Sequence, residues 1–225
     1  MIDRPGYSES NAHDSALDAA WKSVTIPLEQ RRIVDAELER FRAGKPVPPY
    51  DALVALLGNV PDCDALEVGC ASGYYSEVIA LAGLGHRYTG VDYSEAMIRL
   101  ARECYPEGRF DVADARALPH RDGAFGLVID GGCLLHVAGT RECVREYARV
   151  SARHVILHRV PVCFEGSTAR FKKLAYGVAC EETLFRELEL MRIAHDCGLR
   201  LVTFQDIDRR DNYANRSFLF EKVTL

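Results

Sequence analysis

The sequence changes character after Pro61, where short apolar segments begin to alternate with amphipathic ones. Alternation of this kind predicts strands joined by right-handed helical crossovers, and therefore a largely parallel sheet with helices on both faces. The predicted strands are residues 65–69, 87–92, 109–112, 125–130, 155–160, 199–205 and 217–223. The predicted helices are residues 74–82, 95–104, 141–150 and 182–197.

The final two predicted strands lie too close together in sequence for a helical crossover. Only residues 206–216 separate them, whereas a parallel connection usually needs about a dozen residues or more. We therefore predict an antiparallel hairpin at the C-terminal edge. The predicted fold class is α/β: a Rossmann-like, doubly wound sheet of seven strands, mostly parallel with a C-terminal antiparallel hairpin, plus an N-terminal helical extension.

Two additions to this sheet are expected. Residues 1–61 are predicted to form a helical extension, a cap or lid over a domain of residues 62–225. Apolar spacings of three and four predict a helix at 28–41, with shorter helices at 16–21 and 50–57. The aromatic residues expected to cover a ligand are Tyr7, Trp21 and Phe41.

The second addition is a substrate-side insertion near residues 161–179. Its basic and aromatic side chains suit an anionic or planar small molecule, but the run at 170–173 also fits a solvated helix face. The side chains concerned are Phe164, Arg170, Phe171, Lys172, Lys173 and Tyr176.

Composition narrows the function classes. The 225 residues include 28 basic and 33 acidic ones, giving a net charge of −5, which argues against general nucleic-acid binding. No apolar stretch approaches the ~20 residues that span a bilayer, and no secretory signal is evident. The eight cysteines form no C-x-x-C pair and lie mostly in apolar stretches. We therefore expect a cytoplasmic protein with reduced thiols and no membrane contact.

The first predicted strand leads directly into a turn of small residues, Gly69-Cys70-Ala71-Ser72-Gly73. Small residues allow a tight turn and a close approach of the backbone to a ligand. Asp92 ends the second strand, 25 positions after Glu67, where a carboxylate can accept both hydroxyls of a ribose. This pattern predicts a nucleoside-binding site at the carboxyl edge of the sheet.

The details of the turn disfavour a nicotinamide dinucleotide. The G-x-G-x-x-G positions read Gly69, Ala71 and Tyr74, so the fingerprint fails twice. Glu67, beneath the turn, would repel a pyrophosphate. A carboxylate there suits a ligand with cationic groups, either directly or by fixing the loop that holds it. S-adenosylmethionine has an ammonium group, a sulfonium group and no phosphate.

Three ordered segments, ALEVGCASGYYSEVIA, YTGVDYSEAMIRLAREC and FDVADARALPHRDGAFGLVIDGGCLLHV, resemble the class I S-adenosylmethionine-dependent methyltransferases over roughly residues 64–150. The resemblance implies S-adenosylmethionine as cofactor and S-adenosylhomocysteine as product. One departure is Ala71, where many members of the family have glycine.

The resemblance also implies roles for individual residues. Glu67 and the following turn match the motif that holds the methionine portion of the cofactor, and Asp92 matches the ribose ligand. Tyr93 would flank the adenine, although a core or surface aromatic is an equal alternative. Asp114 would accept a hydrogen bond from the adenine amino group, with the N–H of Ala115 beside it. Alternatively, Asp114 would cap a turn. The expected cofactor-binding residues are Glu67, Gly69, Cys70, Ala71, Gly73, Asp92, Tyr93, Met97, Asp114, Ala115, Asp130 and Gly131.

His136 is the candidate general base. It lies six positions after Asp130, in the loop that the family places beside the reacting methyl group, and an ordinary imidazole pKa of ~6.5 suits proton removal near neutrality. The alternative is a structural histidine that orients this loop. His154 and His158 would lie ~13 Å apart along one strand, too far to share an ion, so we predict no metal.

The sequence therefore predicts methyl transfer to an O, N or C nucleophile of a small molecule. The fourth strand ends in Asp130-Gly131-Gly132-Cys133, not in the (D/N)-P-P-(Y/F) sequence usual for enzymes that methylate base amines. Nucleic acid is thus disfavoured as a partner, and a monomer or homodimer is expected. The alternatives are a protein or RNA methyltransferase, a non-catalytic cofactor-binding protein and an NAD-dependent oxidoreductase.

Overall fold

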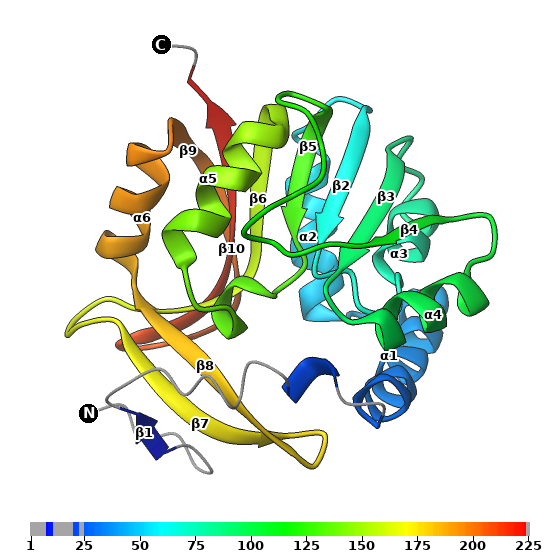
Figure 1. The fold of residues 1–225 in the computed structure, drawn as a ribbon, viewed down its shortest axis with the longest axis horizontal. Helices are drawn as coiled ribbons and strands as arrows, with labels where there is room; N and C mark the ends of the chain where they lie inside the picture. The colour runs from blue at the N-terminus through cyan, green and yellow to red at the C-terminus, as the bar shows by residue number, and fades with distance from the viewer. Residues whose placement is uncertain (1–7, 11–19, 23–24, 224–225) are drawn as a thin grey trace.

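The computed structural model describes residues 8–10, 20–22 and 25–223. Its central feature is a seven-stranded arrangement in the order β4–β3–β2–β5–β6–β10–β9 (Figure 1). The strands from β4 to β6 are parallel, whereas β10 runs antiparallel to both β6 and β9. Their bounds are β2 Asp64–Val68, β3 Arg87–Asp92, β4 Arg109–Val112, β5 Phe125–Asp130, β6 Ser151–Cys163, β9 Leu199–Arg210 and β10 Tyr213–Lys222. The predicted sheet and its C-terminal hairpin are confirmed.

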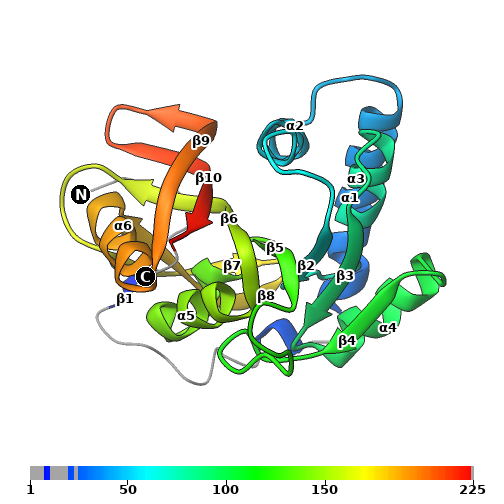
Figure 2. The same cartoon turned by 90° about the horizontal axis from the view of Figure 1, so that it is seen from above.

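Helices cover both faces of this sheet, as Figure 2 shows from above. Alternate side chains of the strands face opposite ways, and both sets are buried. Leu66 and Val128 pack with residues of α5 and α6, whereas Ala65 and Ile129 pack with residues of α1, α2 and α3. The helices are α1 Ile26–Arg42, α2 Pro48–Leu57, α3 Tyr75–Leu81, α4 Glu95–Cys104, α5 Thr140–Val150 and α6 Glu187–Asp196.

The insertion is a β-hairpin rather than a helix face. It consists of β7 (Ala169–Ala175) and β8 (Val178–Arg186), and β1 (Ser8–Ser10) pairs with β7. The prediction of a helix from residue 182 was therefore wrong over its first turn, because residues 182–186 belong to β8. Cross-strand ion pairs of Lys173 with Glu182 and of Arg170 with Glu181 hold this segment in the hairpin.

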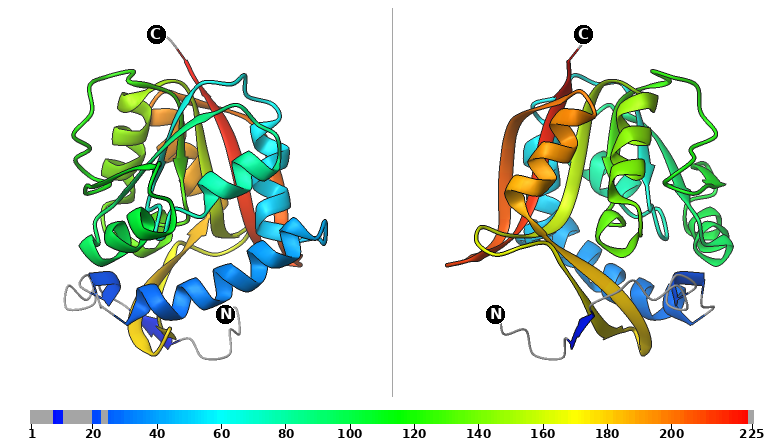
Figure 3. Two further views of the ribbon diagram at one scale, coloured as in Figure 1. Left: turned by 90° about the vertical axis from the view of Figure 1, so that its right-hand side faces the viewer. Right: turned by 60° about the vertical axis from the view of Figure 1, so that its left-hand side comes forward.

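The N-terminal segment begins with a short 3-10 helix, η2 (Ala20–Lys22). The predicted helices at 28–41 and 50–57 are present as α1 and α2, each starting two residues earlier at or beside a proline. Tyr7 and residues 16–19 of the other predicted helix lie outside the described residues. Figure 3 shows η2 and the β7–β8 hairpin on the side of the sheet where the parallel strands end. No helix in the described part of the chain is long and apolar enough to cross a membrane.

Candidate active site

A cavity of about 1100 Å³ lies at the carboxyl ends of the parallel strands, with α1, η2 and the β7–β8 hairpin also contributing to its lining. Eight of the twelve predicted cofactor-binding residues line this cavity, and the other four lie behind its wall. The lining residues are Gly69, Ala71, Asp92, Tyr93, Met97, Asp114, Ala115 and Gly131. Those behind the wall are Glu67, Cys70, Gly73 and Asp130.

The turn after β2 depends on a left-handed backbone. Gly69 and Gly73 both have φ of 75°, and Ala71 has φ of 49°. A Cβ on Gly69 would lie 2.4 Å from the Cβ of Cys133, so the position has no room for a side chain. Ala71, where many family members have glycine, adopts an unfavourable conformation for an L-residue. Its N–H donates to Asp92 Oδ2 at 2.9 Å, which holds the turn in place.

Asp92 ties this turn to the start of α4. Its Oδ1 accepts from the N–H of Ser94 at 2.9 Å while its Oδ2 accepts from Ala71. Burial raises the pKa of Asp92 to about 6, and these backbone donors act in the opposite direction. The carboxylate thus reaches the cavity with each oxygen already bonded to the protein backbone.

Glu67 lies beneath the turn and does not face the cavity. The hydroxyl of Tyr88 donates to Glu67 Oε2. Burial raises the pKa of Glu67 to about 8, and the charges of Asp92 and Asp130 add to the shift. A Cβ on Gly131 would lie 2.3 Å from Glu67 Oε1. Glu67 is therefore placed to fix the loops around the cavity.

Asp130 organises the loop that follows β5. Its fully buried carboxylate accepts from the N–H groups of Gly132, Cys133 and Leu134 and from the hydroxyl of Tyr147. This side chain was expected at the cofactor. Its bonds instead shape the 131–136 loop, and the backbone of that loop reaches the cavity.

Asp114 forms the local turn that was its alternative role, and its predicted contact with adenine stays a prediction. Its Oδ1 accepts from the N–H of Arg116 at 2.8 Å, which makes a local turn, and both oxygens pair with the Arg116 guanidinium. These bonds lower the pKa of Asp114. The residue also lines the cavity beside Ala115 and near Tyr93. The ammonium of Lys22, from η2, lies 5.5 Å from the centre of the Tyr93 ring.

His136 ends the short helix η3 (Leu134–His136) and lines the cavity. Its Nδ1 lies 2.8 Å from the carbonyl oxygen of Glu181. Because a carbonyl only accepts, Nδ1 carries the proton, and neutral Nε2 keeps a lone pair. Burial lowers the pKa of His136 to about 4, and the charge of Glu182 offsets this only in part. The imidazole is thus neutral at pH 7. The expectation of an ordinary pKa was wrong, because burial makes His136 a weaker base than an exposed histidine.

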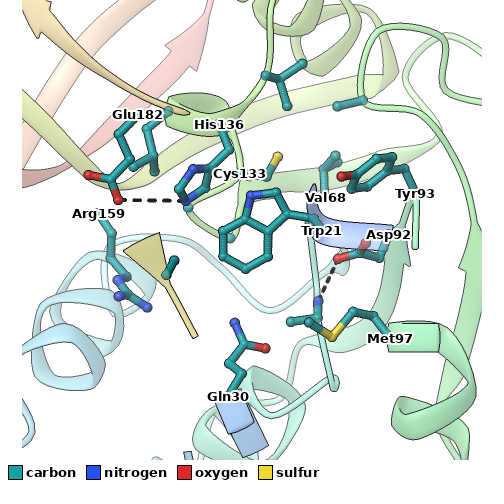
Figure 4. Close-up of a pocket in the computed structure, with 18 of the residues that line it drawn as sticks. Trp21, Gln30, Val68, Asp92, Tyr93, Met97, Cys133, His136, Arg159 and Glu182 are labelled. Atoms are coloured by element: carbon teal, nitrogen blue, oxygen red, sulfur yellow. Dashed lines mark hydrogen bonds and ion pairs between the residues drawn. The ribbon is translucent and has the colours of Figure 1, made fainter. Parts of the chain in front are cut away.

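The opposite side of the cavity holds residues of the N-terminal segment and the hairpin. The ring of Trp21 lies 4.6 Å from His136 and 6.0 Å from Tyr176, centre to centre. Figure 4 shows Asp92 and Tyr93 on one side of Trp21, with Arg159 on the other. Phe41, also expected as a lid residue, instead packs against Tyr50.

The predicted insertion residues lie in different places. Lys173 and Tyr176 line the cavity, whereas Phe164 packs against the guanidinium groups of Arg209 and Arg216.

Sequence reasoning missed Arg159, Glu182 and Asn215 as cavity residues. Arg159 carried a usable signal, since it stands near the end of a predicted parallel strand. Glu182 had been assigned to a helix.

Among the described residues, no group of three or more histidine, cysteine or acidic side chains could hold a metal ion. The absence of a metal stays a prediction.

A family model described as a methyltransferase domain matches residues 66–157, which contain the turn after β2, Asp92 and the loop after β5. Over these residues the chain thus matches a methyltransferase domain, and the relatives that it resembles include S-adenosylmethionine-dependent methyltransferases. S-adenosylmethionine is the cofactor of this family.

A solved methyltransferase shares the fold of the whole chain. The Burkholderia thailandensis 1,6-didemethyltoxoflavin-N1-methyltransferase, with 1,6-didemethyltoxoflavin and S-adenosylhomocysteine bound, aligns with a TM-score of 0.66 at 17% identity. The alignment covers 100% of this chain and 98% of that chain.

Curated relatives match over shorter segments. A probable S-adenosylmethionine-dependent methyltransferase of Mycobacterium tuberculosis is 29% identical over 149 residues, which are 65% of this chain and 51% of that protein. A trans-aconitate 2-methyltransferase of Delftia acidovorans is 40% identical over 62 residues, covering 26% of this chain and 23% of that protein. The chain thus spans about half the length of the first relative.

Proposed function

We propose that this chain transfers a methyl group from S-adenosylmethionine to an O, N or C nucleophile of a small molecule. The observation that carries the proposal is the division of one cavity into two sides. One side has the glycine turn, Asp92 and Asp114, and the other has His136 beneath Trp21 and Tyr176.

The first side fits the cofactor. Gly69 and Gly131 have no room for a Cβ, which would clash with Cys133 and Glu67, so only glycine allows these turns to pack closely beside the methionine portion. Asp92 is placed for the ribose hydroxyls, with Tyr93, Asp114 and Ala115 around the adenine. When bound, the cofactor supplies an activated methyl group on a sulfonium. Glu67 and Asp130 act from behind the wall by positioning the two loops.

On the second side, His136 is the proposed general base. Its Nδ1–H is fixed by the Glu181 carbonyl, which directs the Nε2 lone pair away from that bond. An acceptor hydroxyl or N–H can pass its proton to Nε2 during methyl transfer. The protein otherwise contributes alignment of the acceptor and exclusion of water.

The residues around the second side support a small acceptor over a protein or an RNA. Trp21 and Tyr176 are in ring contact above His136, so an acceptor shares this space with two large aromatic side chains. The negative net charge also weighs against nucleic acid. Relatives named for small acceptors, such as trans-aconitate, agree with this proposal.

Calorimetry tests cofactor binding. S-adenosylmethionine and S-adenosylhomocysteine are expected to bind with 1:1 stoichiometry, whereas NAD gives no heat of binding. Asp92→Asn is expected to lower the affinity for S-adenosylhomocysteine. An amide accepts hydrogen bonds at its oxygen only, whereas a carboxylate accepts them at both oxygens. Tight NAD binding, or no binding of either sulfur nucleoside, would refute the proposal.

A methyl-transfer screen tests catalysis. Protein and S-adenosylmethionine labelled in the methyl group are incubated with metabolite extracts, purified RNA and mixed protein. We expect label in the small-molecule fraction alone. Label only in RNA or protein would contradict the assigned acceptor class, and binding without any transfer would favour a non-catalytic role.

A further inference from the structure

β6 contains a bulge beside the cavity. Val160 pairs with Arg216 and Leu157 pairs with Phe218, so His158 and Arg159 together face Ser217 alone. Arg159 has φ of 60°, a left-handed conformation that residues with a Cβ rarely adopt. Such a conformation persists where its surroundings fix it, and bulges often redirect a side chain next to an active site.

A buried hydrogen-bond chain holds this bulge. The hydroxyl of Tyr75 lies 2.8 Å from His158 Nε2, and His158 Nδ1 lies 2.7 Å from the hydroxyl of Ser217. The N–H of Arg159 donates to the same hydroxyl at 3.3 Å. Three side chains with almost no exposed surface therefore set the direction of Arg159.

Arg159 lines the cavity next to the loop after β5. A Cβ on Gly132 would lie 3.6 Å from the Cβ of Arg159 and 3.8 Å from its Cδ, so the arginine stem crosses that glycine. Arg159 lines the cavity with protein around it. Burial alone would lower the pKa of Arg159, but the nearby phenols of Tyr75 and Tyr74 raise it overall, and an arginine stays charged at physiological pH.

Within residues 8–10, 20–22 and 25–223, the Arg159 guanidinium forms no ion pair with a carboxylate. The groups nearest to it are the phenols of Tyr74, Tyr75 and Tyr176. Lys173 and Glu182, the other charges on this side of the cavity, pair with each other. The indole N–H of Trp21 is likewise buried without a hydrogen-bond partner among these residues.

We propose that the methyl acceptor is an organic anion whose carboxylate binds Arg159, with the Trp21 N–H as a second donor. This inference rests on the proposed function. A guanidinium binds a carboxylate with two parallel hydrogen bonds, which fixes orientation as well as charge. A carboxylate would supply the counter-charge that Arg159 lacks and the acceptor that Trp21 lacks.

The test compares carboxylates with their amides on protein saturated with S-adenosylhomocysteine. Benzoate, salicylate, succinate and tricarballylate are titrated beside the primary amides of the same skeletons. We expect at least one acid to bind more than about tenfold tighter than its amide. Arg159→Gln should abolish this preference and Arg159→Lys should keep part of it. Equal binding of acids and amides by the wild type would overturn the proposal.

Arg32→Gln is the matched control for lost positive charge. Arg32 also borders the cavity, but its side chain is 78% exposed and pairs with Glu29. The acid preference should survive in this variant. If it disappears equally in Arg32→Gln and Arg159→Gln, general electrostatics explain the binding and the Arg159 site is wrong.

The cofactor also has a carboxylate, so a second experiment tests whether Arg159 binds the carboxylate of the acceptor or that of the cofactor. S-adenosylhomocysteine and 5′-methylthioadenosine, which lacks the amino-acid end, are titrated into wild type and Arg159→Gln. Unchanged affinity for both supports the acceptor site. A loss confined to S-adenosylhomocysteine would assign Arg159 to the cofactor and overturn the proposal. Failure of the wild type to bind either nucleoside would instead refute the proposed function.

Discussion

The two sides of the cavity differ in how their polar groups are satisfied. At the ends of β2, β3 and β5, the carboxylates of Asp92 and Asp130 accept hydrogen bonds from backbone N–H groups of the loops they hold. On the other side, Trp21 Nε1 and Asn215 Oδ1 are buried without hydrogen-bond partners among the described residues. No carboxylate of these residues forms an ion pair with Arg159, which lies near tyrosine phenols.

On the first side the protein itself supplies the hydrogen-bond partners of its polar groups, whereas on the second side we expect a ligand to supply them. A buried polar group without a partner costs about 1–3 kcal/mol, so the second side costs folding stability until a ligand supplies the missing bonds. The first side is preorganised by glycines and backbone donors. We therefore expect substitutions on the first side to affect folding and cofactor affinity, and those on the second side to affect transfer.

His136→Ala is expected to have the largest effect. Loss of the base should lower the transfer rate by about 10²–10⁴-fold while the affinity for S-adenosylhomocysteine stays unchanged. The measurement is single-turnover transfer of labelled methyl to the acceptor found in the screen, with calorimetry alongside. His195→Ala, on the exposed side of α6, is the control. A wild-type rate in His136→Ala would leave His136 a structural residue.

The same histidine predicts the shape of the pH profile. Burial holds the pKa of His136 at about 4, so its Nε2 is unprotonated throughout pH 6–8. The wild-type transfer rate should therefore show no fall with a midpoint near pH 6.5. A fall that is present in the wild type and absent in His136→Ala would contradict this pKa.

Gly131→Ala should affect the first side. The added Cβ would meet Glu67 Oε1 and the carbonyl oxygen of Gly69, and overpacking of this kind costs about 1–3 kcal/mol. We expect a lower free energy of unfolding in chemical denaturation and a lower affinity for S-adenosylhomocysteine. Gly58→Ala, whose Cβ would meet no atom closer than 3.6 Å, is the control. If both variants behave alike, the close packing of Gly131 has no role in binding.

Arg159→Gly should make the ligand-free protein more stable. Glycine relieves the left-handed backbone, a strain of about 1–3 kcal/mol. Chemical denaturation of the ligand-free variant is expected to show this gain, and Arg159→Ala, which keeps the strain, should show less of it. A loss of stability in Arg159→Gly would mean that the arginine supports the fold.

Glu67 is expected to make the folding stability depend on pH. Its pKa is about 8 when folded against an ordinary value of 4.5, so the folded state binds the proton more tightly. This stabilisation is fully present below pH 4.5 and is lost as pH rises through 8, at no more than about 1.4 kcal/mol per pH unit. Glu67→Gln should flatten the stability profile of the ligand-free protein between pH 5.5 and 8.5. An unchanged slope would place the titrating group elsewhere.

Most of the sheet could be predicted because its strands are short apolar runs separated by helices, and both signals are local. The β7–β8 hairpin could not, because its pairing rests on ion pairs such as Lys173–Glu182 that join residues nine positions apart. Charged residues of that kind also fit a helix surface. The pairing of β7 with β8, which the local sequence does not show, makes this segment a strand and not a helix.

The site shows a similar limit. Motif positions identified the lining residues Asp92, Asp114 and Gly69, but motifs do not state where a side chain points. Glu67 and Asp130 turn away from the cavity toward hydrogen-bond donors. Tyr88 in β3 donates to Glu67, and Tyr147 in α5 and the loop after β5 donate to Asp130. The position of Arg159 near a strand end could be read from the sequence, but its direction could not, since a bulge with a left-handed arginine has no signature in the sequence.

Trp21 and Tyr176 touch above His136 although more than 150 positions separate them in the chain. In the proposed function, acceptor choice is thereby divided between two stretches that lie outside the strand ends assigned to the adenosine. Because their rings pack against each other, a replacement in one stretch also alters the surface that the other presents to the acceptor. A change of methylated compound is accordingly within reach of a few replacements in either one.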